Sequence, residues 1–358
     1  MPVKLPEKTA PTTKPEPRKA QVAPSSMIDR IPVKLVLMLA APYLAGESPD
    51  AAIELAHKLH AKDRYTSTLD ILGEDMESAA DCDASVEAYK NLVDLIISNP
   101  LPVTTSQEQI TISFKPSMFS TTAPKGTGYS DPELDKAFER IKKVTDYAKR
   151  LGVNVTLEAE DNRWTDFHLD TYVELINQGY TNLGTVIQSR LFRTANDISR
   201  FDERMRTRLV IGIYNEPNDI AHTNKSVMKD LVVSYAQRLL EKGTYVEIAT
   251  HDVDCLDKFF GNVVLPGKIS RTRFETQYLH GVPRDDIQHG LINGSYFNKE
   301  KFPAANAEHL QELATTGVVV RKYLPFGEGH VSGAYCRRRL KENPNMALYG
   351  IKNFFKMQ

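Results

Sequence analysis

Eight short β-like runs alternate with helical runs along most of the chain, and this alternation constrains the fold more than any other feature. Each run is five to seven residues long and carries Val, Ile, Leu, Thr or aromatic residues, which is typical of strands. The β-like runs are Tyr65–Asp70, Gln109–Phe114, Asn154–Glu158, Leu183–Gln188, Arg208–Tyr214, Val246–Thr250, Arg273–Leu279 and Val318–Leu324. The helical runs include Ala51–Ala61, Ala84–Ser98, Asp131–Arg150, Thr171–Gln178, Lys225–Lys242 and Ala307–Thr315. Strands that alternate with helices form parallel sheets, and eight of them predict an α/β fold of the (βα)8 TIM-barrel type.

Chain length and composition predict one large domain. A length of 358 residues accommodates a (βα)8 barrel with an N-terminal extension. We expect a single barrel domain over residues 27–358, preceded within that range by a helical segment at residues 27–63. Residues 1–26 are rich in proline and charged residues and predict a disordered tail. The apolar run Leu35–Leu44 predicts a helix that is too short to span a bilayer.

Charge and cysteine content exclude several classes of partner. A net charge of −1 and a pI near 6.8 argue against a nucleic-acid-binding surface. Cys82, Cys255 and Cys336 lack CxxC spacing, which predicts free thiols in a reducing compartment. The run His251–Cys255 crowds its polar residues on one strand end, so we expect no metal site there. These features together favour a cytoplasmic protein without a nucleic-acid partner.

Polar or aromatic residues follow most of the predicted strands. In a parallel barrel the carboxyl ends of the strands converge on one mouth, so residues far apart in sequence meet there. The sequence therefore predicts an active-site layout. The residues in question are Asp70, Lys115, Glu160, Arg190, Tyr214, His251, His280 and Tyr323.

The segment after the last predicted strand concentrates charge on one helical face. Tyr335, Arg338, Arg339 and Glu342 stand at i, i+3, i+4 and i+7, so they share a face of a helix. Two guanidinium groups beside a phenol suit a small anionic ligand that is bound in a bidentate manner. The alternative interpretation is a solvated basic helix end.

An ordered set of segments identifies a family resemblance. The segments are Thr68–Glu74, Ile112–Pro116, Glu158–Asp161, Val186–Leu191, Arg208–Tyr214, Ala249–Asp252, Phe274–Gly281 and Tyr323–Glu342. Together they resemble the proline dehydrogenase family, flavoenzymes with a distorted eight-stranded barrel. The resemblance covers roughly residues 45–345.

The resemblance implies an activity and assigns residues to it. Members of this family move a hydride from the carbon next to the nitrogen of proline to N5 of FAD, forming 1-pyrroline-5-carboxylate, and pass the electrons to a quinone. Lys115, Arg338 and Arg339 would hold the substrate carboxylate, and Glu342 would brace the two arginines. The resemblance further implies that Glu158 is the partner of Lys115. The walls around the substrate ring would be Tyr214, Leu279, Tyr323 and Tyr335, and the residues in contact with FAD would be Gln188, Arg208, Gly212, Thr250, His251 and Gln277.

Departures from the family pattern leave alternatives open. The family usually has Lys-Gly-Ala-Tyr where this chain has Ile211–Tyr214, it commonly has Asp at the position of Glu158, and Thr276 replaces a usual Phe. One alternative is therefore a relative that oxidises another cyclic or N-alkyl amino acid. Another is a barrel that binds an amino acid without turnover, because the change at Ile211 has weakened flavin binding.

The last residues leave the relation to a membrane open. Residues 346–357 combine Leu348, Ile351, Phe354 and Phe355 with two lysines, a pattern that suits contact with a bilayer surface. Such contact would bring the enzyme to a quinone and place it at the inner face of the membrane. Packing of this segment against the barrel is the alternative.

Overall fold

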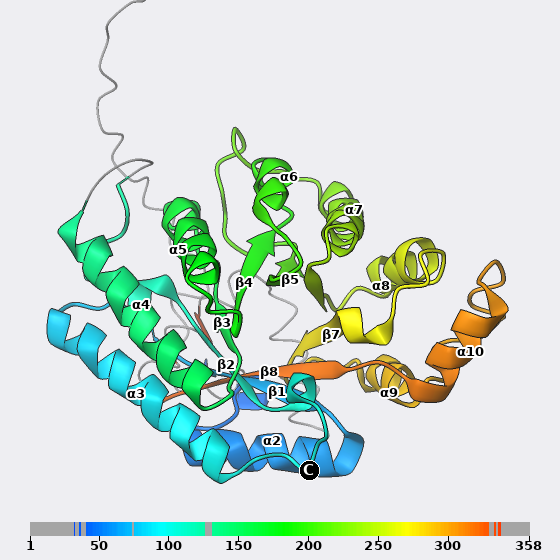
Figure 1. Ribbon diagram of the computed structural model, residues 1–358, viewed down its shortest axis with the longest axis horizontal. Coiled ribbons are helices and arrows are strands. Elements are labelled where there is room, and N and C mark those ends of the chain that lie inside the picture. Colours follow the sequence, from blue (N-terminus) through cyan, green and yellow to red (C-terminus); the bar gives the residue numbers. More distant parts are fainter. Residues whose placement is uncertain are drawn as a thin grey trace, which may run out of the picture.

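Eight parallel strands close into a barrel in chain order, so the predicted fold class is confirmed (Figure 1). The computed structural model describes residues 41–73, 75–125 and 131–328, together with positions 32, 36, 333, 336 and 337. The barrel closes where β1 pairs with β8, with Thr68 opposite Tyr323. The strands are β1 (Thr66–Ile71), β2 (Thr111–Phe114), β3 (Val155–Leu157), β4 (Leu183–Gln188), β5 (Arg206–Val210), β6 (Tyr245–Ala249), β7 (Phe274–Leu279) and β8 (Val320–Phe326).

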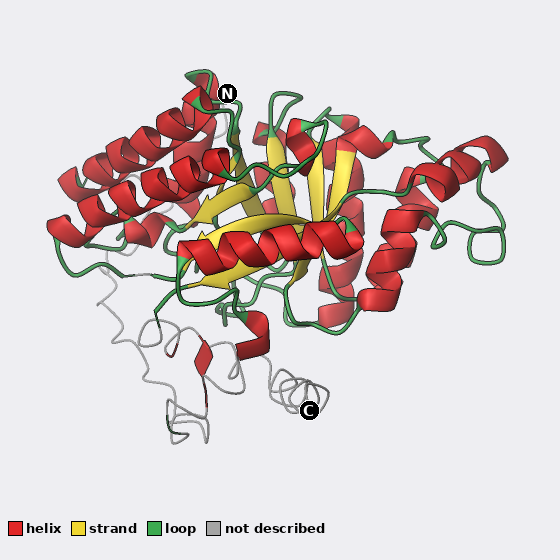
Figure 2. Cartoon of the chain, turned by 90° about the horizontal axis from the view of Figure 1, so that it is seen from below, coloured by secondary structure: helices red, strands yellow, loops and turns green. Residues whose placement is uncertain are grey.

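Helices surround the strands on the outside of the barrel (Figure 2). Local sequence explains where several of them begin. Ser48 accepts a hydrogen bond from the backbone of Ala51 ahead of α2, and Ser78 with Asp81 forms a capping box ahead of α3. The helices are α2 (Pro49–Asp63), α3 (Ala79–Ser98), α4 (Pro132–Arg150), α5 (Thr165–Asn177), α6 (Thr194–Asp197), α7 (Lys225–Glu241), α8 (Val253–Phe259), α9 (Asp285–Asn293) and α10 (Ala307–Thr316).

The predicted end of the fifth strand is wrong. The sequence predicted a strand through Tyr214, but β5 ends at Val210. Gly212 has φ +98°, a conformation that leaves the strand region and that glycine adopts most readily. The chain therefore turns at the barrel mouth four residues earlier than the Val-Ile-Gly-Ile-Tyr pattern suggested.

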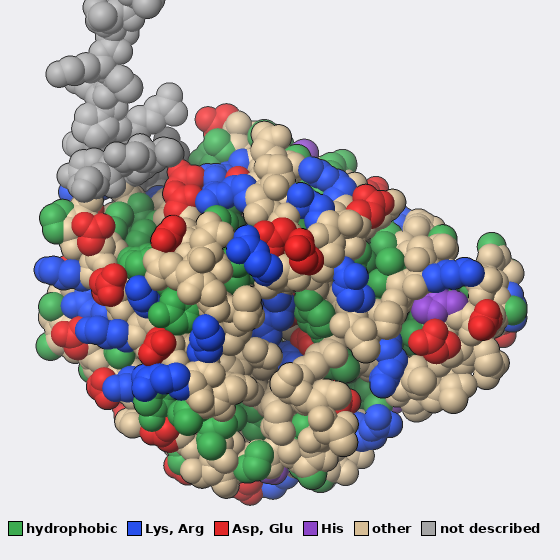
Figure 3. Space-filling model, in the orientation of Figure 1, with side chains coloured by type: hydrophobic (Ala, Val, Ile, Leu, Met, Phe, Trp, Pro, Cys, Tyr) green, Lys and Arg blue, Asp and Glu red, His purple; other side chains and the backbone are tan. Residues whose placement is uncertain are grey.

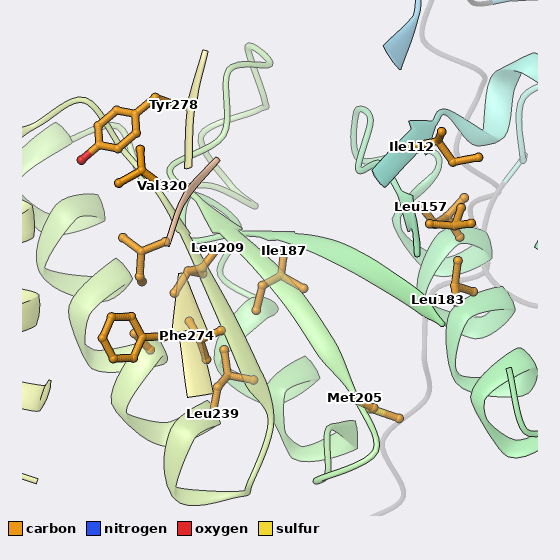
Figure 4. Packing of buried hydrophobic residues seen from close by; sticks show 14 of the residues in the cluster. Ile112, Leu157, Leu183, Ile187, Met205, Leu209, Leu239, Phe274, Tyr278 and Val320 are labelled. Carbon is orange, nitrogen blue, oxygen red and sulfur yellow. The ribbon is translucent and has the colours of Figure 1, made fainter. Parts of the chain in front are cut away.

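The hydrophobic core lies between the barrel wall and the helices. Ile112, Leu157, Ile187 and Leu209 are almost fully buried and belong to one apolar cluster, part of which is shown in Figure 4. Because side chains alternate along a strand, the neighbouring positions face the barrel interior. In β5 these alternate positions hold two arginines, Arg206 and Arg208.

The barrel interior is polar and charged. The guanidinium of Arg321 on β8 lies 2.6 Å from the carboxylate of Glu275 on β7, and that of Arg206 lies 3.3 Å from Glu247 on β6. Arg321 also donates to the backbone oxygens of Ser67 and Gln109. Since an unpaired charge is costly to bury, each of these carboxylates depends on a guanidinium of a neighbouring strand.

Two further findings concern the exterior and the thiols. None of the helices in the described ranges is both long enough and apolar enough to cross a membrane. Cys82, Cys255 and Cys336 are buried and free, in agreement with the absence of paired cysteine motifs.

Lys322 gives a prediction about stability. Its side chain points away from the barrel interior and is 4% exposed, with the ammonium 4.3 Å from the centre of the Tyr65 ring. Burial lowers the pKa of Lys322 from 10.5 to about 8, although Asp285 and Asp63 oppose this effect. Between these two pH values the unfolded chain binds more protons, so the free energy of unfolding should rise with pH. A shift of this size corresponds to on the order of 3 kcal/mol.

The prediction can be checked with Lys322→Met by chemical denaturation between pH 7 and pH 10.5. The variant should lose the rise, while Lys62→Met, whose side chain is 80% exposed, should keep it. Identical pH profiles for wild type and Lys322→Met would contradict the assignment.

Candidate active site

A buried ion pair lies at the carboxyl ends of the first two strands. The ammonium of Lys115 is 3.2 Å from Oδ2 of Asp70, and their side chains are 8% and 0% exposed. Burial raises the pKa of Asp70 and Glu158 adds to this effect, whereas Lys115 and a hydrogen bond with Tyr323 lower it. Asp70 was predicted at the mouth but was given no role, and the structure makes it a partner of Lys115.

Arg208 is held from several sides within the barrel. Its Nε donates to Oε1 of Gln277 at 2.5 Å, and its Nη1 donates to the carboxylate of Glu158. The guanidinium carbon is 5.1 Å from the centre of the Tyr323 ring. Burial alone lowers the pKa of Arg208, but Glu158 and Glu247 outweigh it and raise the pKa above its usual range.

The structure gives Glu158 a partner that was not predicted. Glu158 forms an ion pair with Arg208, and Lys115 forms an ion pair with Asp70. The reason is geometric, since the arginine of β5 reaches across the interior to the end of β3. Sequence spacing does not specify which cation a carboxylate meets across a barrel.

One nitrogen of Arg208 has no protein partner. Nη2 is buried and makes no hydrogen bond with any residue that the structure describes. A buried donor of this kind normally has an acceptor, because leaving it unsatisfied costs about 1 to 3 kcal/mol. Arg208 can therefore donate one hydrogen bond to a ligand without losing its contacts with Glu158 and Gln277.

The loops after β2, β3 and β5 and the end of β4 pack against one another. Glu160 accepts hydrogen bonds from the backbone and the hydroxyl of Ser117 at 2.9 and 2.8 Å. Nε2 of Gln188 donates to the carbonyl oxygen of Glu160 at 2.9 Å. A Cβ at Gly212 would lie 2.6 Å from Oε1 of Gln188, so the close approach of the loop after β5 to the end of β4 requires glycine.

A neutral histidine lies at the ends of β6 and β7. Nε2 of His251 accepts from the backbone N–H of Leu279 at 3.3 Å, and burial lowers the pKa of His251 to about 4, aided by Lys322 and Arg284. His251 is therefore neutral at pH 7, and from the hydrogen bond at Nε2 we infer that Nδ1 carries the proton. Nδ1 is buried without a partner among the described residues, so it is a second free donor. The neighbouring Thr250 uses its hydroxyl to accept from the backbone of Asp252 at 3.1 Å.

The predicted residues on the described strands share one end of the barrel. Leu279 is in register with Tyr323 across β7 and β8, and the carbonyl oxygen of Tyr214 accepts from the guanidinium of Arg190. On the face seen in Figure 3, a hollow near the middle has basic side chains at its base. The residues brought to this end are Lys115, Glu158, Gln188, Arg208, Gly212, Tyr214, Thr250, His251, Gln277, Leu279 and Tyr323.

Part of the predicted site lies outside the described residues. Tyr335, Arg338, Arg339 and Glu342 fall in this part, so their assignment as a carboxylate clamp stays a prediction. Sequence reasoning also missed two residues that the structure places beneath Arg208, namely Glu247 and Glu275. Each is an acidic residue inside an apolar β-like run, and this feature of the sequence could have identified them as interior residues.

Two of the departures from the family pattern have side chains that contact other parts of the protein. Thr276 is fully buried, and its hydroxyl donates to the carbonyl oxygen of Val319 at 3.3 Å, while its neighbours Glu275 and Gln277 face the interior. Ile211 packs against the hydrophobic core. Thr276 therefore faces away from the barrel interior in which Arg208 lies.

The fold and site define a (βα)8-barrel protein with paired charges at the carboxyl ends of its strands. A family model described as proline dehydrogenase matches residues 52–348, which is most of the chain. The chain belongs to the proline dehydrogenase family.

Individual relatives agree with this assignment. The chain is 27% identical over 337 residues to a proline dehydrogenase from Deinococcus radiodurans, covering 94% of this chain and 96% of that one. It is 26% identical over 315 residues to proline dehydrogenase 1 of Bacillus subtilis strain 168, covering 88% and 90%.

A solved structure is similar in fold. Proline utilization A (PutA) from Bdellovibrio bacteriovorus, inactivated by N-propargylglycine, matches with a TM-score of 0.70 and 23% identity over 87% of this chain. The match spans 33% of that longer chain. At 23% identity, this similarity shows the fold alone.

Gly212 gives a prediction that separates backbone strain from crowding. Gly212→Ala places a side chain at φ +98° and against Gln188, whereas Gly152→Ala has φ +74° and nothing within 4 Å of its Cβ. Gly152→Ala should lower the free energy of unfolding by about 1 kcal/mol, and Gly212→Ala should lower it by about 2 to 3 kcal/mol. Chemical denaturation of the two variants measures the difference. Equal losses would show that Gln188 does not crowd this position.

Proposed function

We propose that this protein is an FAD-dependent proline dehydrogenase. It would move a hydride from the carbon next to the nitrogen of L-proline to N5 of FAD, form 1-pyrroline-5-carboxylate, and pass the electrons to a quinone-type acceptor. The observation that supports the proposal is the buried Arg208 in a barrel of this family, because one of its guanidinium nitrogens has no hydrogen-bond partner among the described residues.

The residues at the mouth fit a flavin. Nη2 of Arg208 and Nδ1 of His251 are buried donors without described partners, and FAD offers ring oxygens, ring nitrogens and phosphate oxygens as acceptors. FAD supplies the electron-accepting ring. The positive charge of Arg208 favours the added negative charge of a reduced flavin, and Glu158 and Gln277 hold that charge in place. The residues proposed to hold the cofactor are Gln188, Arg208, Gly212, Thr250 and His251 by direct contact, and Gln277 through its hydrogen bond with Arg208.

The substrate side combines a cation with apolar walls. Lys115 forms an ion pair with Asp70. Tyr323 connects this pair to Arg208, because its side chain makes a hydrogen bond with Asp70 and its ring lies next to the guanidinium of Arg208. Lys115 would bind the carboxylate of proline together with Arg338 and Arg339, with Glu342 bracing the arginines. Tyr214, Leu279, Tyr323 and Tyr335 would enclose the ring. This arrangement catalyses by positioning, because it fixes the reacting carbon over the flavin.

One observation favours the first alternative, a relative that oxidises another amino acid. The side chain of Ile213 is 37% exposed on the loop after β5, next to Tyr214. A change at this rim suits a substrate of a different size, such as another cyclic or N-alkyl amino acid. The second alternative is a barrel that binds an amino acid without turnover. It rests on the change at Ile211, whose half-buried side chain packs against the hydrophobic core directly after the end of β5.

The proposal is tested by anaerobic titration of the purified protein. The sample should be yellow, and L-proline should bleach the flavin absorbance more effectively than hydroxyproline or N-methyl amino acids do. Bleaching by an N-methyl amino acid in preference to proline would favour the alternative substrate. A colourless protein that FAD does not reconstitute would refute the proposal.

The carboxylate clamp gives a second prediction. Arg338→Ala or Arg339→Ala should weaken the apparent affinity for proline by about 2 to 4 kcal/mol, because each removes one side of a desolvated charge pair. This equals roughly a 30- to 1,000-fold rise in the dissociation constant, with little change in flavin content. Arg337→Ala is the matched control, since it removes the adjacent cation of the same run and should leave the affinity within about threefold. Unchanged affinity in both clamp variants would exclude the assignment.

A further inference from the structure

The side-chain amide of Gln277 is held by three protein groups. Its Oε1 accepts from Nε of Arg208 at 2.5 Å. Its Nε2 donates to Oε2 of Glu247 at 2.7 Å and to Oε1 of Glu275 at 2.6 Å. Gln277 is 3% exposed, so these bonds form inside the barrel. An amide nitrogen has two hydrogens, and both are used here.

The orientation of the amide is fixed by the groups around it. The carbonyl oxygen must face Arg208, which can only donate, and the nitrogen must face the carboxylates of Glu247 and Glu275. A flipped amide would place its NH2 against a guanidinium and its oxygen against two carboxylates. Gln277 therefore joins the arginine at the mouth to two acidic residues deeper in the interior.

Glu247 is the deeper residue closest to Arg208. Its Oε2 is 3.7 Å from Nε of Arg208, and its Oε1 is 3.3 Å from Nε of Arg206. Glu275 is instead paired with Arg321 at 2.6 Å. Burial raises the pKa of Glu247 and Glu275 adds to this, whereas Arg206 and Arg208 lower it. The charge of Glu247 thus depends on the same arginine that it helps to hold.

We propose that Gln277 and Glu247 form a positioning pair that sets the orientation and the electrostatic strength of Arg208 from inside the barrel. This rests on the proposed function, because it assigns Arg208 to the flavin. Gln277 then acts through Arg208, and its role differs from the direct FAD contact that the family resemblance implied. Glu158 fixes Nη1, the positioning pair fixes Nε, and Nη2 is left to point to the cofactor.

The test uses Glu247→Gln, Gln277→Met and the double variant, each compared with the intact flavoprotein. The readouts are the dissociation constant of FAD and the midpoint potential of the bound flavin. Glu247→Gln removes a negative charge near Arg208, so the potential should rise and FAD should bind about tenfold more weakly. Gln277→Met removes the group that accepts a hydrogen bond from Nε of Arg208, so it should weaken the binding of FAD by a similar factor. The double variant should lose no more affinity than the weaker-binding single variant, since both changes interrupt one chain of contacts.

A matched control separates positioning from general stability. Glu133→Gln breaks the ion pair with Arg140 on α4, in which the side chains are 14% and 7% exposed, at a place remote from Arg208. It should lower the melting temperature but leave the potential and the FAD affinity unchanged.

Three outcomes overturn the proposal. The first is wild-type potential and FAD affinity in both single variants, whatever their melting temperatures. The second is additive loss in the double variant, which would mean that the two residues act separately. The third applies if Glu247→Gln does not fold. In that case, unchanged FAD affinity in Gln277→Met alone overturns the proposal. A wild-type protein that binds no FAD refutes the proposed function itself and is recognised before any variant is made.

Discussion

The burial of Arg208 among carboxylates is the interaction on which the site depends. A guanidinium inside a barrel is stable only when its charge is compensated, and Glu158 and Glu247 provide this compensation from β3 and β6. The same contacts leave one nitrogen of the guanidinium without a partner among the residues that the structure describes. The structural requirement for ion pairing and the functional requirement for a fixed donor are therefore met by one arrangement of side chains.

Charge balance extends this arrangement through the barrel. The interior pairs Lys115 with Asp70, Arg208 with Glu158, Arg206 with Glu247, and Arg321 with Glu275, so that each named cation has a carboxylate partner. The apolar packing that drives folding lies outside the barrel, where strand residues meet the helices. Charges can be placed inside this barrel because apolar packing in the outer layer stabilises the fold and these four ion pairs balance one another's charge.

The sequence predicted the barrel well because strand and helix alternation is a local property. It failed where contacts between distant residues, or the backbone conformation of one residue, decide the structure. The family resemblance implied that Glu158 is the partner of Lys115, and it did not indicate the ion pair that Glu158 forms with Arg208 across the interior. The end of β5 was misplaced because a left-handed glycine interrupts an otherwise strand-like run. The short helices α8 and α9 have too few turns to show a clear periodicity, so they were not predicted.

A crystal structure of the protein with FAD bound would test the central claim most directly, through the surroundings of Arg208. The account predicts that Nη1 keeps its bond to Glu158 and Nε keeps its bond to Gln277, while Nη2 lies within hydrogen-bond distance of an acceptor on the flavin ring. It would be contradicted by a flavin ring that makes no contact with Nη2, or by an Arg208 that leaves Glu158 and Gln277 when the cofactor binds.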